Sequence, residues 1–374
     1  MVNRHHRGGP WVGSPHGSLP LVVLLGFGVS GSGCSERSRE VRPGAAAVPA
    51  PMPAVPRPAR ERPVRRVAAR PVDPDPPATL LEATARRLAG DDQRLRAGKL
   101  VSYTSRFSGQ VHVEQKGSVR LLYVGRKDVI QTRMDMRHPA RLLSPYLQCM
   151  VVALGFFAEP RKELRRVAMI GLGGGAWTRF FHARRPRLVF HSVDIDPLVV
   201  AIARRFFGVR DTATYRSYAM DGRRFLREAK RSYDLIVLDA FDAAANVPRQ
   251  LVSVEFFRLI RRRLSPHGVV AINFLVHSRH VYSALVRTVR SVFPAVARFP
   301  LRRLSTHNTL LVAPKDLGRR PRPDVLRARV RRIQKRLGLS YSLARCVQTL
   351  DRDRLLAPTG PLLRDPPPPA ALPR

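Results

Sequence analysis

The chain has 374 residues, enough for one large or two modest domains with a hydrophobic core. It carries 67 Lys and Arg against 27 Asp and Glu, and the formal net charge is +40. Such a charge attracts nucleic acid or anionic lipid without specificity. The sequence holds no nucleic-acid-reading motif and no zinc-ligand spacing, which excludes specific nucleic acid as an expected partner. Arginine is abundant throughout, so the charge indicates a solvated basic surface.

Residues 1–34 have the order of a secretory signal, with a basic start, an apolar run at 19–29 and small residues before Cys34. The end of this segment resembles a lipoprotein cleavage site, although Gly31 stands where a branched apolar residue is usual. The run is too short to span a bilayer permanently. Because the ligand predicted below is a cytosolic metabolite, a cytoplasmic location is favoured. The alternative is export or lipid anchoring through the segment ending at Cys34, and in that alternative membrane association would be through this segment only.

Residues 35–78 are dominated by Pro, Ala and Arg, a composition that buries little surface, so we predict a disordered linker. Residues 79–143 are predicted to contain a leading helix at 79–100 and a small antiparallel β unit. Alternating runs place three strands in that unit, at 111–114, 119–124 and 129–132. Residues 317–374 are predicted to form a basic helical and Pro-rich tail.

The three cysteines are odd in number and far apart: Cys34, Cys149 and Cys346. This spacing predicts neither a disulfide framework nor a metal site. Cys149 lies in the apolar helical pattern of residues 144–157, so we expect it in the core. Ser144 is expected near the N-cap of that helix, with Pro145 in its first turn.

Residues 166–197 combine a strand, a glycine-rich turn, a helix and a second strand. The continuous apolar run at 167–170 predicts a parallel strand buried on both faces. Four glycines follow, and they let a ligand approach the backbone at the start of the helix: Gly171, Gly173, Gly174 and Gly175. Asp194 ends the second strand, roughly 20 residues past the glycines, where such folds place an acid on ribose hydroxyls. The pattern predicts a nucleoside-binding βαβ unit.

Strands and helices alternate through the rest of residues 144–316, which predicts an α/β domain with a doubly wound, mostly parallel sheet. The predicted strands are 212–219, 233–238, 268–273 and 309–312, and the predicted helices are 197–207, 223–229, 255–264 and 281–292. Three strands end in an acid: Asp194, Asp221 and Asp239. A helix N-cap explains any one of them. Because ligands lie over the carboxyl ends of such strands, their shared position favours one site.

The runs VAMIGLGGG, VDID, MDGRRFL and YDLIVLDAFD resemble the polyamine aminopropyltransferase (spermidine synthase) family, over about residues 105–315. Members of that family transfer an aminopropyl group from decarboxylated S-adenosylmethionine to putrescine on a methyltransferase-like Rossmann core. The resemblance implies a transferase of polyamine biosynthesis that acts on a small-molecule amine. The reaction that the resemblance implies requires no metal. The oligomeric state expected is a possible homodimer.

The resemblance also implies roles for individual residues. Asp194 would hold the donor ribose, and Asp221 and Gly222 would meet the adenine. Ile195 would also bind the donor, and Gln131 would lie along the substrate and cofactor channel. Asp239 would orient and deprotonate the amine, with Asp242 assisting and Tyr146 lining the substrate channel. Attack on a sulfonium carbon needs an uncharged amine, which a carboxylate at Asp239 supplies by accepting a proton.

The chain departs from the family's sequence pattern at three positions. Gly174 stands where the family has the Asp that grips the aminopropyl ammonium, Ala243 replaces a proline, and Tyr146 is one residue further from the next glutamine. A methyltransferase using ordinary S-adenosylmethionine is therefore an alternative, and a non-catalytic nucleoside-binding protein is a second. A nicotinamide-dependent dehydrogenase also fits Gly171, Gly173 and Ala176, but the later acidic motifs argue against it.

Overall fold

The computed structural model describes residues 78–125, 127, 130–157, 164–242, 246–275, 279–304, 307–316, 321–350 and 360–365. They belong to one compact unit, Val67–Arg374. The predicted signal segment with Cys34, almost all of the predicted linker, Val129 and parts of the C-terminal tail lie outside the described residues. Within the described ranges, no helix has both the length and the apolar character needed to cross a membrane.

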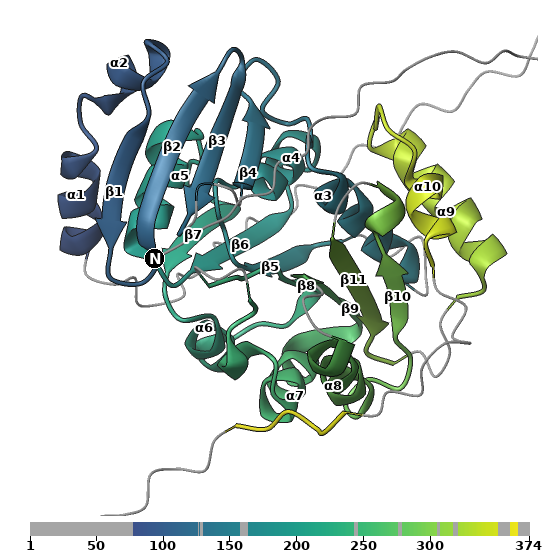
Figure 1. Cartoon of the computed structure of the whole chain (residues 1–374). Helices are drawn as coiled ribbons and strands as arrows, with labels where there is room; N and C mark the ends of the chain where they lie inside the picture. Colours follow the sequence, from purple (N-terminus) through teal and green to yellow (C-terminus); the bar gives the residue numbers. More distant parts are fainter. Residues whose placement is uncertain are drawn as a thin grey trace, which may run out of the picture. The chain divides into compact units, whose positions relative to one another are not determined.

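A seven-stranded sheet with strand order β10-β11-β9-β8-β5-β6-β7 forms the centre of this unit (Figure 1). Its strands are β5 (Arg166–Ile170), β6 (Val189–Asp194), β7 (Tyr215–Ala219), β8 (Tyr233–Leu238), β9 (Leu264–Leu275), β10 (Ala297–Pro300) and β11 (Asn308–Pro314). Strands β5 to β9 are parallel, and β11 and β10 are antiparallel additions at one edge. The predicted doubly wound, mostly parallel sheet is confirmed. Its strand order reverses beside β5, where such sheets bind ligands.

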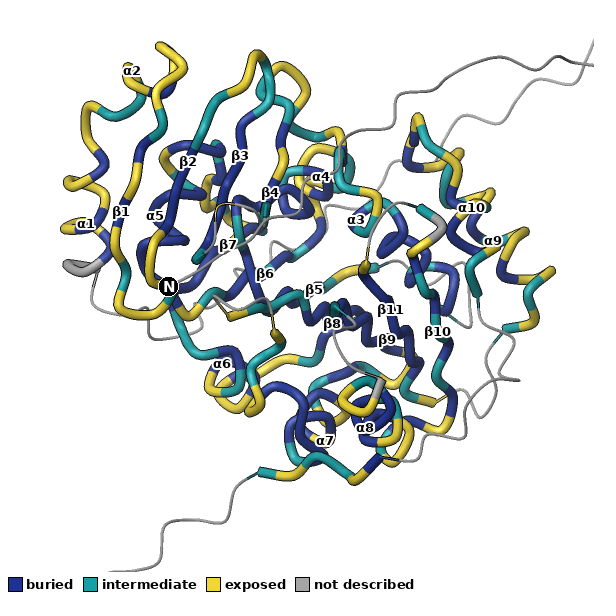
Figure 2. Tube along the Cα trace, viewed as in Figure 1, coloured by how far each residue is buried: buried dark blue, intermediate teal, exposed yellow. Residues whose placement is uncertain are grey.

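Helices cover both faces of this sheet, because alternate strand residues point to opposite sides. Val167 and Met169 of β5 belong to the core under α4 (Ala176–Arg184) and α5 (Pro197–Phe206). Ala168 and Ile170 belong to a second core, on the side of the other helices. Those helices are α6 (Gly222–Glu228), α7 (Val254–Arg263) and α8 (Arg279–Arg290). Figure 2 shows the central strands buried between these layers.

The predicted small antiparallel unit is a four-stranded sheet in the order β1-β2-β3-β4. Its strands are β1 (Val101–Ser105), β2 (Gly109–Lys116), β3 (Val119–Val124) and β4 (Ile130–Asp135). The predicted hairpin turn at Lys116 and Gly117 is confirmed, and β1 is a strand that the sequence analysis missed. The predicted leading helix is two helices, α1 (Ala78–Arg87) and α2 (Asp91–Arg96), because Gly90 between them has φ +89°.

The helix predicted at 144–157 changes its geometry halfway. It is α3 (Pro145–Met150) followed by a 3-10 helix, η1 (Val151–Phe156). Two further 3-10 turns, η2 (Arg249–Leu251) and η3 (Arg302–Leu304), and the strand β10 were also not predicted. The C-terminal part contains α9 (Pro323–Arg336) and α10 (Leu343–Gln348).

The prediction of no disulfide is wrong. Cys149 of α3 and Cys346 of α10 are joined by an S–S bond of 2.13 Å, although 197 residues separate them in the sequence. Both are buried, so the expectation that Cys149 lies in the core is confirmed. Spacing could not predict the pair, because the fold alone brings α10 against α3.

Candidate active site

A pocket opens over the carboxyl ends of β5, β6, β7 and β8 and is closed on its other side by β4 and α3. It is lined by most of the predicted site residues: Gln131, Tyr146, Gly171, Gly173, Asp194, Ile195, Asp221, Gly222 and Asp239. Three predicted residues are not in the lining, namely Gly174, Gly175 and Asp242. The three strand-end acids therefore share one site, as their common position in the sheet predicts.

The glycine turn is built against the end of β8. Gly171 has φ +97°, and a Cβ there would lie 2.1 Å from the carbonyl oxygen of Asp239, so only glycine fits. The backbone N–H of Asp239 in turn donates to the carbonyl of Ile170 at 2.8 Å. The nucleoside turn and the candidate base are consequently held together by backbone contacts.

Asp194 shapes the same turn from β6. Its Oδ2 accepts hydrogen bonds from the N–H of Leu172 at 3.0 Å and of Gly173 at 3.4 Å. Its Oδ1 accepts the N–H of Asp196 at 3.1 Å. Burial raises the pKa of Asp194 to about 6, against the lowering effect of these bonds. The sequence suggested only a ribose contact, but this carboxylate also fixes the backbone that a nucleoside would meet.

Gly174 lies behind the pocket, in a tight space. Its N–H donates to Thr132 Oγ1 of β4 at 2.9 Å. A Cβ at this position would lie 2.8 Å from Thr132 Cγ2 and 3.0 Å from a ring carbon of Phe207. The side chains of Thr132 on β4 and Phe207 at the end of α5 therefore occupy the space that a side chain at position 174 would need. Direct contact of Gly174 or Gly175 with a cofactor stays a prediction.

Asp221 and Gly222 begin α6 at the rim of the pocket. Asp221 is the N-cap of α6, and its Oδ1 accepts the N–H of Arg224 at 2.8 Å. A Cβ on Gly222 would lie 2.4 Å from Ile170 Cγ2, so glycine lets the helix start press against β5. The N-cap explanation for Asp221 is thus confirmed, and the residue still faces the pocket.

Asp239 is the most strongly perturbed acid of the site. Its Oδ1 accepts a hydrogen bond from Asn273 Nδ2 at 2.8 Å, and its Oδ2 faces the hydroxyl of Tyr146 at 3.5 Å. Burial raises the pKa of Asp239 to about 7, and the two hydrogen bonds act in the opposite direction. Burial and then the neighbouring Asp239 raise the pKa of Tyr146, so the phenol stays a donor. A carboxylate of this pKa can exchange a proton near neutral pH.

A pair of buried asparagines behind Asp239 escaped the sequence analysis. Asn308 Nδ2 of β11 donates to Asn273 Oδ1 of β9 at 3.0 Å, which turns the Asn273 amide N–H toward Asp239. Both side chains are buried. An asparagine at the end of the predicted strand 268–273 was the available signal, but its partner depends on the antiparallel register of β9 and β11.

Asp242 is not part of the described pocket lining. It is exposed, and its Oδ1 accepts the N–H of Asn246 at 2.9 Å across residues 243–245, which lie outside the described ranges. Its predicted assistance to Asp239 stays a prediction.

The charge of the lining is opposite to that of the whole chain. Asp194, Asp221 and Asp239 all face the pocket, and among its described lining residues none is Lys, Arg or His. The remaining lining is apolar or neutral, including Gln131 and Tyr146. In a chain with 67 Lys and Arg, the site favours a cationic ligand.

Comparisons with known proteins identify a family domain and relatives of this chain. Residues 145–308 match the model of the spermine/spermidine synthase domain. The polyamine aminopropyltransferase of Chromobacterium violaceum is 30% identical over 234 residues, which cover 62% of this chain and 86% of that protein. Polyamine aminopropyltransferase 2 of Pseudomonas aeruginosa is 33% identical over 226 residues, covering 54% of this chain and 63% of that protein. An eEF1A lysine and N-terminal methyltransferase homolog of Drosophila melanogaster is 22% identical over 214 residues, covering 54% and 32%.

Among solved structures, a probable spermidine synthase from Corynebacterium glutamicum has the same fold. It aligns with a TM-score of 0.57 at 17% identity, covering 73% of this chain and 99% of that one. The motifs and the sequence relatives together identify the family. The chain belongs to the polyamine aminopropyltransferase (spermidine synthase) family and is a transferase with a methyltransferase-like Rossmann core.

Proposed function

We propose that this protein transfers an aminopropyl group from decarboxylated S-adenosylmethionine to a polyamine or related amine. The observation that carries the proposal is the pocket with three carboxylates and no described Lys, Arg or His. The donor has a sulfonium and an ammonium, and the acceptor is an ammonium until it reacts, so carboxylates favour both. Ordinary S-adenosylmethionine carries a carboxylate, for which the described lining offers no cation.

The donor would lie over the glycine turn. In this arrangement Asp194 and Ile195 hold the ribose, and Asp221 and Gly222 meet the adenine. Gln131 of β4 closes the pocket from the opposite side. These roles rest on the position of each residue in the pocket lining and on the matching family motifs.

Asp239 would act as the base. It accepts a proton from the acceptor ammonium, and the freed lone pair attacks the donor carbon next to the sulfonium. A C–N bond forms while the C–S bond breaks, and the electron pair stays on sulfur, which leaves as a neutral thioether. Tyr146, whose hydroxyl faces Asp239, would direct the amine toward that carbon.

The test is incubation of the purified protein with either nucleoside donor and a panel of diamines and triamines, followed by mass spectrometry of the products. We expect aminopropylated amine and a thioether nucleoside from the decarboxylated donor only. Asp239→Asn should reduce the rate by at least about 100-fold, the usual contribution of a general base. If Asp239→Asn is as active as the wild type, the proposed mechanism is wrong.

A methyltransferase is the second candidate, because Gly174 leaves no acid to grip an aminopropyl ammonium and the adjacent space is filled by Thr132 and Phe207. The same incubations distinguish the two: a methylated product without an aminopropylated one would favour it. No product with any amine, together with tight nucleoside binding, would favour a non-catalytic binding protein.

A further inference from the structure

Helix α3 carries Tyr146 and Leu147 into the pocket, and it is only six residues long. A helix of this length has no stability of its own, so its neighbours fix its orientation. On the pocket side, Trp177 Nε1 donates to the Leu147 carbonyl at 2.9 Å. Gln148 Nε2 donates to the Leu142 carbonyl at 2.7 Å. Among the described residues, the Tyr146 hydroxyl has only one hydrogen-bond contact, a long one of 3.5 Å to Asp239.

Behind α3 lies the C-terminal helix pair α9 and α10, which begins after the part of the chain that matches the family domain. Leu326 and Val330 of α9 pack against Gly155 of η1. A Cβ added to Gly155 would lie 2.7 Å from Leu326 Cδ1. Arg329 donates to the carbonyls of Gly155 and Phe157, both at 3.1 Å. The helix pair therefore covers the segment that directly continues α3.

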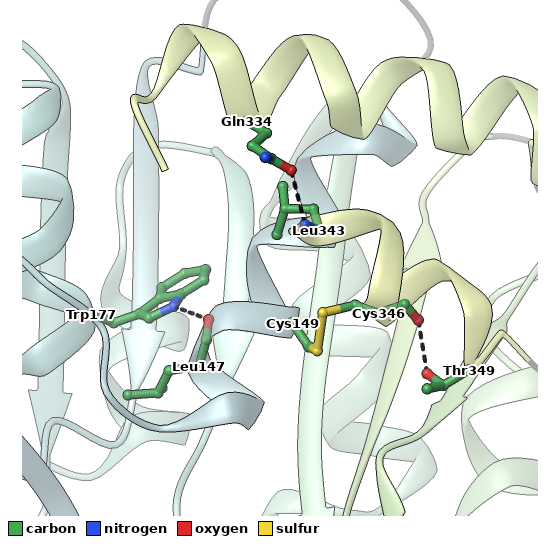
Figure 3. Close-up of a disulfide and its surroundings, with 7 residues drawn as sticks. All are labelled: Leu147, Cys149, Trp177, Gln334, Leu343, Cys346 and Thr349. Atoms are coloured by element: carbon green, nitrogen blue, oxygen red, sulfur yellow. Dashed lines mark hydrogen bonds between the residues drawn. A yellow bond between two sulfur atoms is a disulfide. The ribbon is translucent and has the colours of Figure 1, made fainter. Parts of the chain in front are cut away.

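The two C-terminal helices also hold one another. The side chain of Gln334 in α9 accepts the N–H of Leu343, the first residue of α10, at 3.0 Å. Figure 3 shows this bond above the Cys149–Cys346 disulfide, and the Trp177 contact on the other side of α3. Cys149 follows Tyr146 by three residues, so the covalent link acts within one turn of the side chain that faces Asp239.

We propose that the Cys149–Cys346 disulfide is a positioning element of the acceptor site: it fixes α3 and thereby holds Tyr146 at Asp239. The inference rests on the proposed function, in which Tyr146 directs the amine. It predicts different effects on the two halves of the pocket, because the glycine turn, Asp194 and Asp221 lie on elements other than α3. Opening the disulfide should weaken acceptor binding and leave donor binding intact.

The experiment compares the full oxidised chain with three unlinked forms, Cys346→Ser, Cys149→Val/Cys346→Ala and the wild type reduced by dithiothreitol. The reagent gives two electrons and two protons to the disulfide, leaving two thiols and its own cyclic disulfide, and thiol titration verifies the conversion. We expect the acceptor KM to rise at least about 10-fold, the scale of a small misplacement of a substrate-positioning group. The melting-temperature shift caused by the donor nucleoside should stay within experimental error.

A destabilised control separates positioning from loss of stability. Asp234 lies at the start of β8, opposite the pocket, where its Oδ2 accepts the N–H of Arg165 and of Arg166, both at 2.9 Å. Asp234→Ala should lower the melting temperature and leave the acceptor KM unchanged. Gln334→Ala keeps the covalent link and should change that KM by less than about two-fold.

Three outcomes would overturn the inference. In the first, the unlinked forms have the acceptor KM of the oxidised chain. In the second, donor and acceptor binding weaken together. In the third, no unlinked form folds, which would make the disulfide a folding requirement only. An oxidised wild type that transfers no aminopropyl group refutes the proposed function instead, so the two failures are distinguishable.

Discussion

Asn273 should control the pH at which the enzyme works, because its amide donates to the carboxylate of Asp239 at 2.8 Å. Replacing it in Asn273→Leu keeps a similar volume and removes this donor. A hydrogen bond to a charged group contributes about 1.5–3 kcal/mol, and one pKa unit corresponds to about 1.4 kcal/mol. The pKa of Asp239, which burial raises to about 7 in the wild type, should therefore rise further, by about 1–2 units.

The sign of the effect on rate follows from the role of the carboxylate. A base must be ionised, so the rate rises with pH as Asp239 loses its proton. At pH 7 about half of the wild-type carboxylate is ionised in the donor-free enzyme, against about one-tenth to one-hundredth in Asn273→Leu, so kcat/KM for the donor should fall about 5- to 50-fold. The loss should disappear at about pH 9.5, where both forms are largely ionised.

The assay is the pH profile of kcat/KM for the donor, which reports the ionisation of the donor-free enzyme, expressed as the ratio of variant to wild type. This ratio removes the titration of the amine, which is common to both proteins. Thr309→Val is the matched control, because Thr309 is the buried neighbour of Asn308 on β11 and points to the other face of the sheet. If the ratio for Asn273→Leu is flat across pH, the hydrogen bond does not set the protonation of Asp239, and the reasoning is refuted.

Three further variants test the support of the pocket. Asp194→Ala should weaken donor binding at least about 10-fold in calorimetry, because two backbone N–H groups of the glycine turn lose a charged acceptor; unchanged affinity would contradict this. Gly174→Ala should lower the free energy of unfolding by about 1–3 kcal/mol in urea, since its Cβ would lie 2.8 Å from Thr132; an unchanged midpoint would show that the space is open. Asp365→Ala removes one partner of the half-buried Arg223, which also donates to Gln250 and Ser253, and should cost about 1–3 kcal/mol by the same measurement; an unchanged free energy of unfolding would contradict this.

The parts of the fold that sequence could predict are those with a local pattern. The apolar run before Gly171, the alternation of strands and helices, and the acids at three strand ends each leave a signal within a few residues. The carboxyl ends of parallel strands lie at one edge of the sheet. These local signals were therefore enough to predict that Asp194, Asp221 and Asp239 line one pocket.

The missed features depend on pairs that are distant in sequence. Asn273 meets Asn308 only through the antiparallel register of β9 and β11, and Cys149 meets Cys346 only because α10 packs on α3. Gly174 could be recognised as a departure from the family, but not as a filled space, since its neighbours come from β4 and the end of α5.

Binding of the donor should change the protonation of the acids in the pocket. Burial raises the pKa of both Asp194 and Asp239, so in the free protein these carboxyls resist ionisation. A sulfonium bound beside them would favour the ionised forms and lower both pKa values. By linkage, the protonation state that best binds the donor is also the state in which Asp239 can accept a proton. Under the proposed function, donor binding thus prepares the base before the amine reacts, and the described lining, which includes no Lys or Arg, does not oppose this coupling.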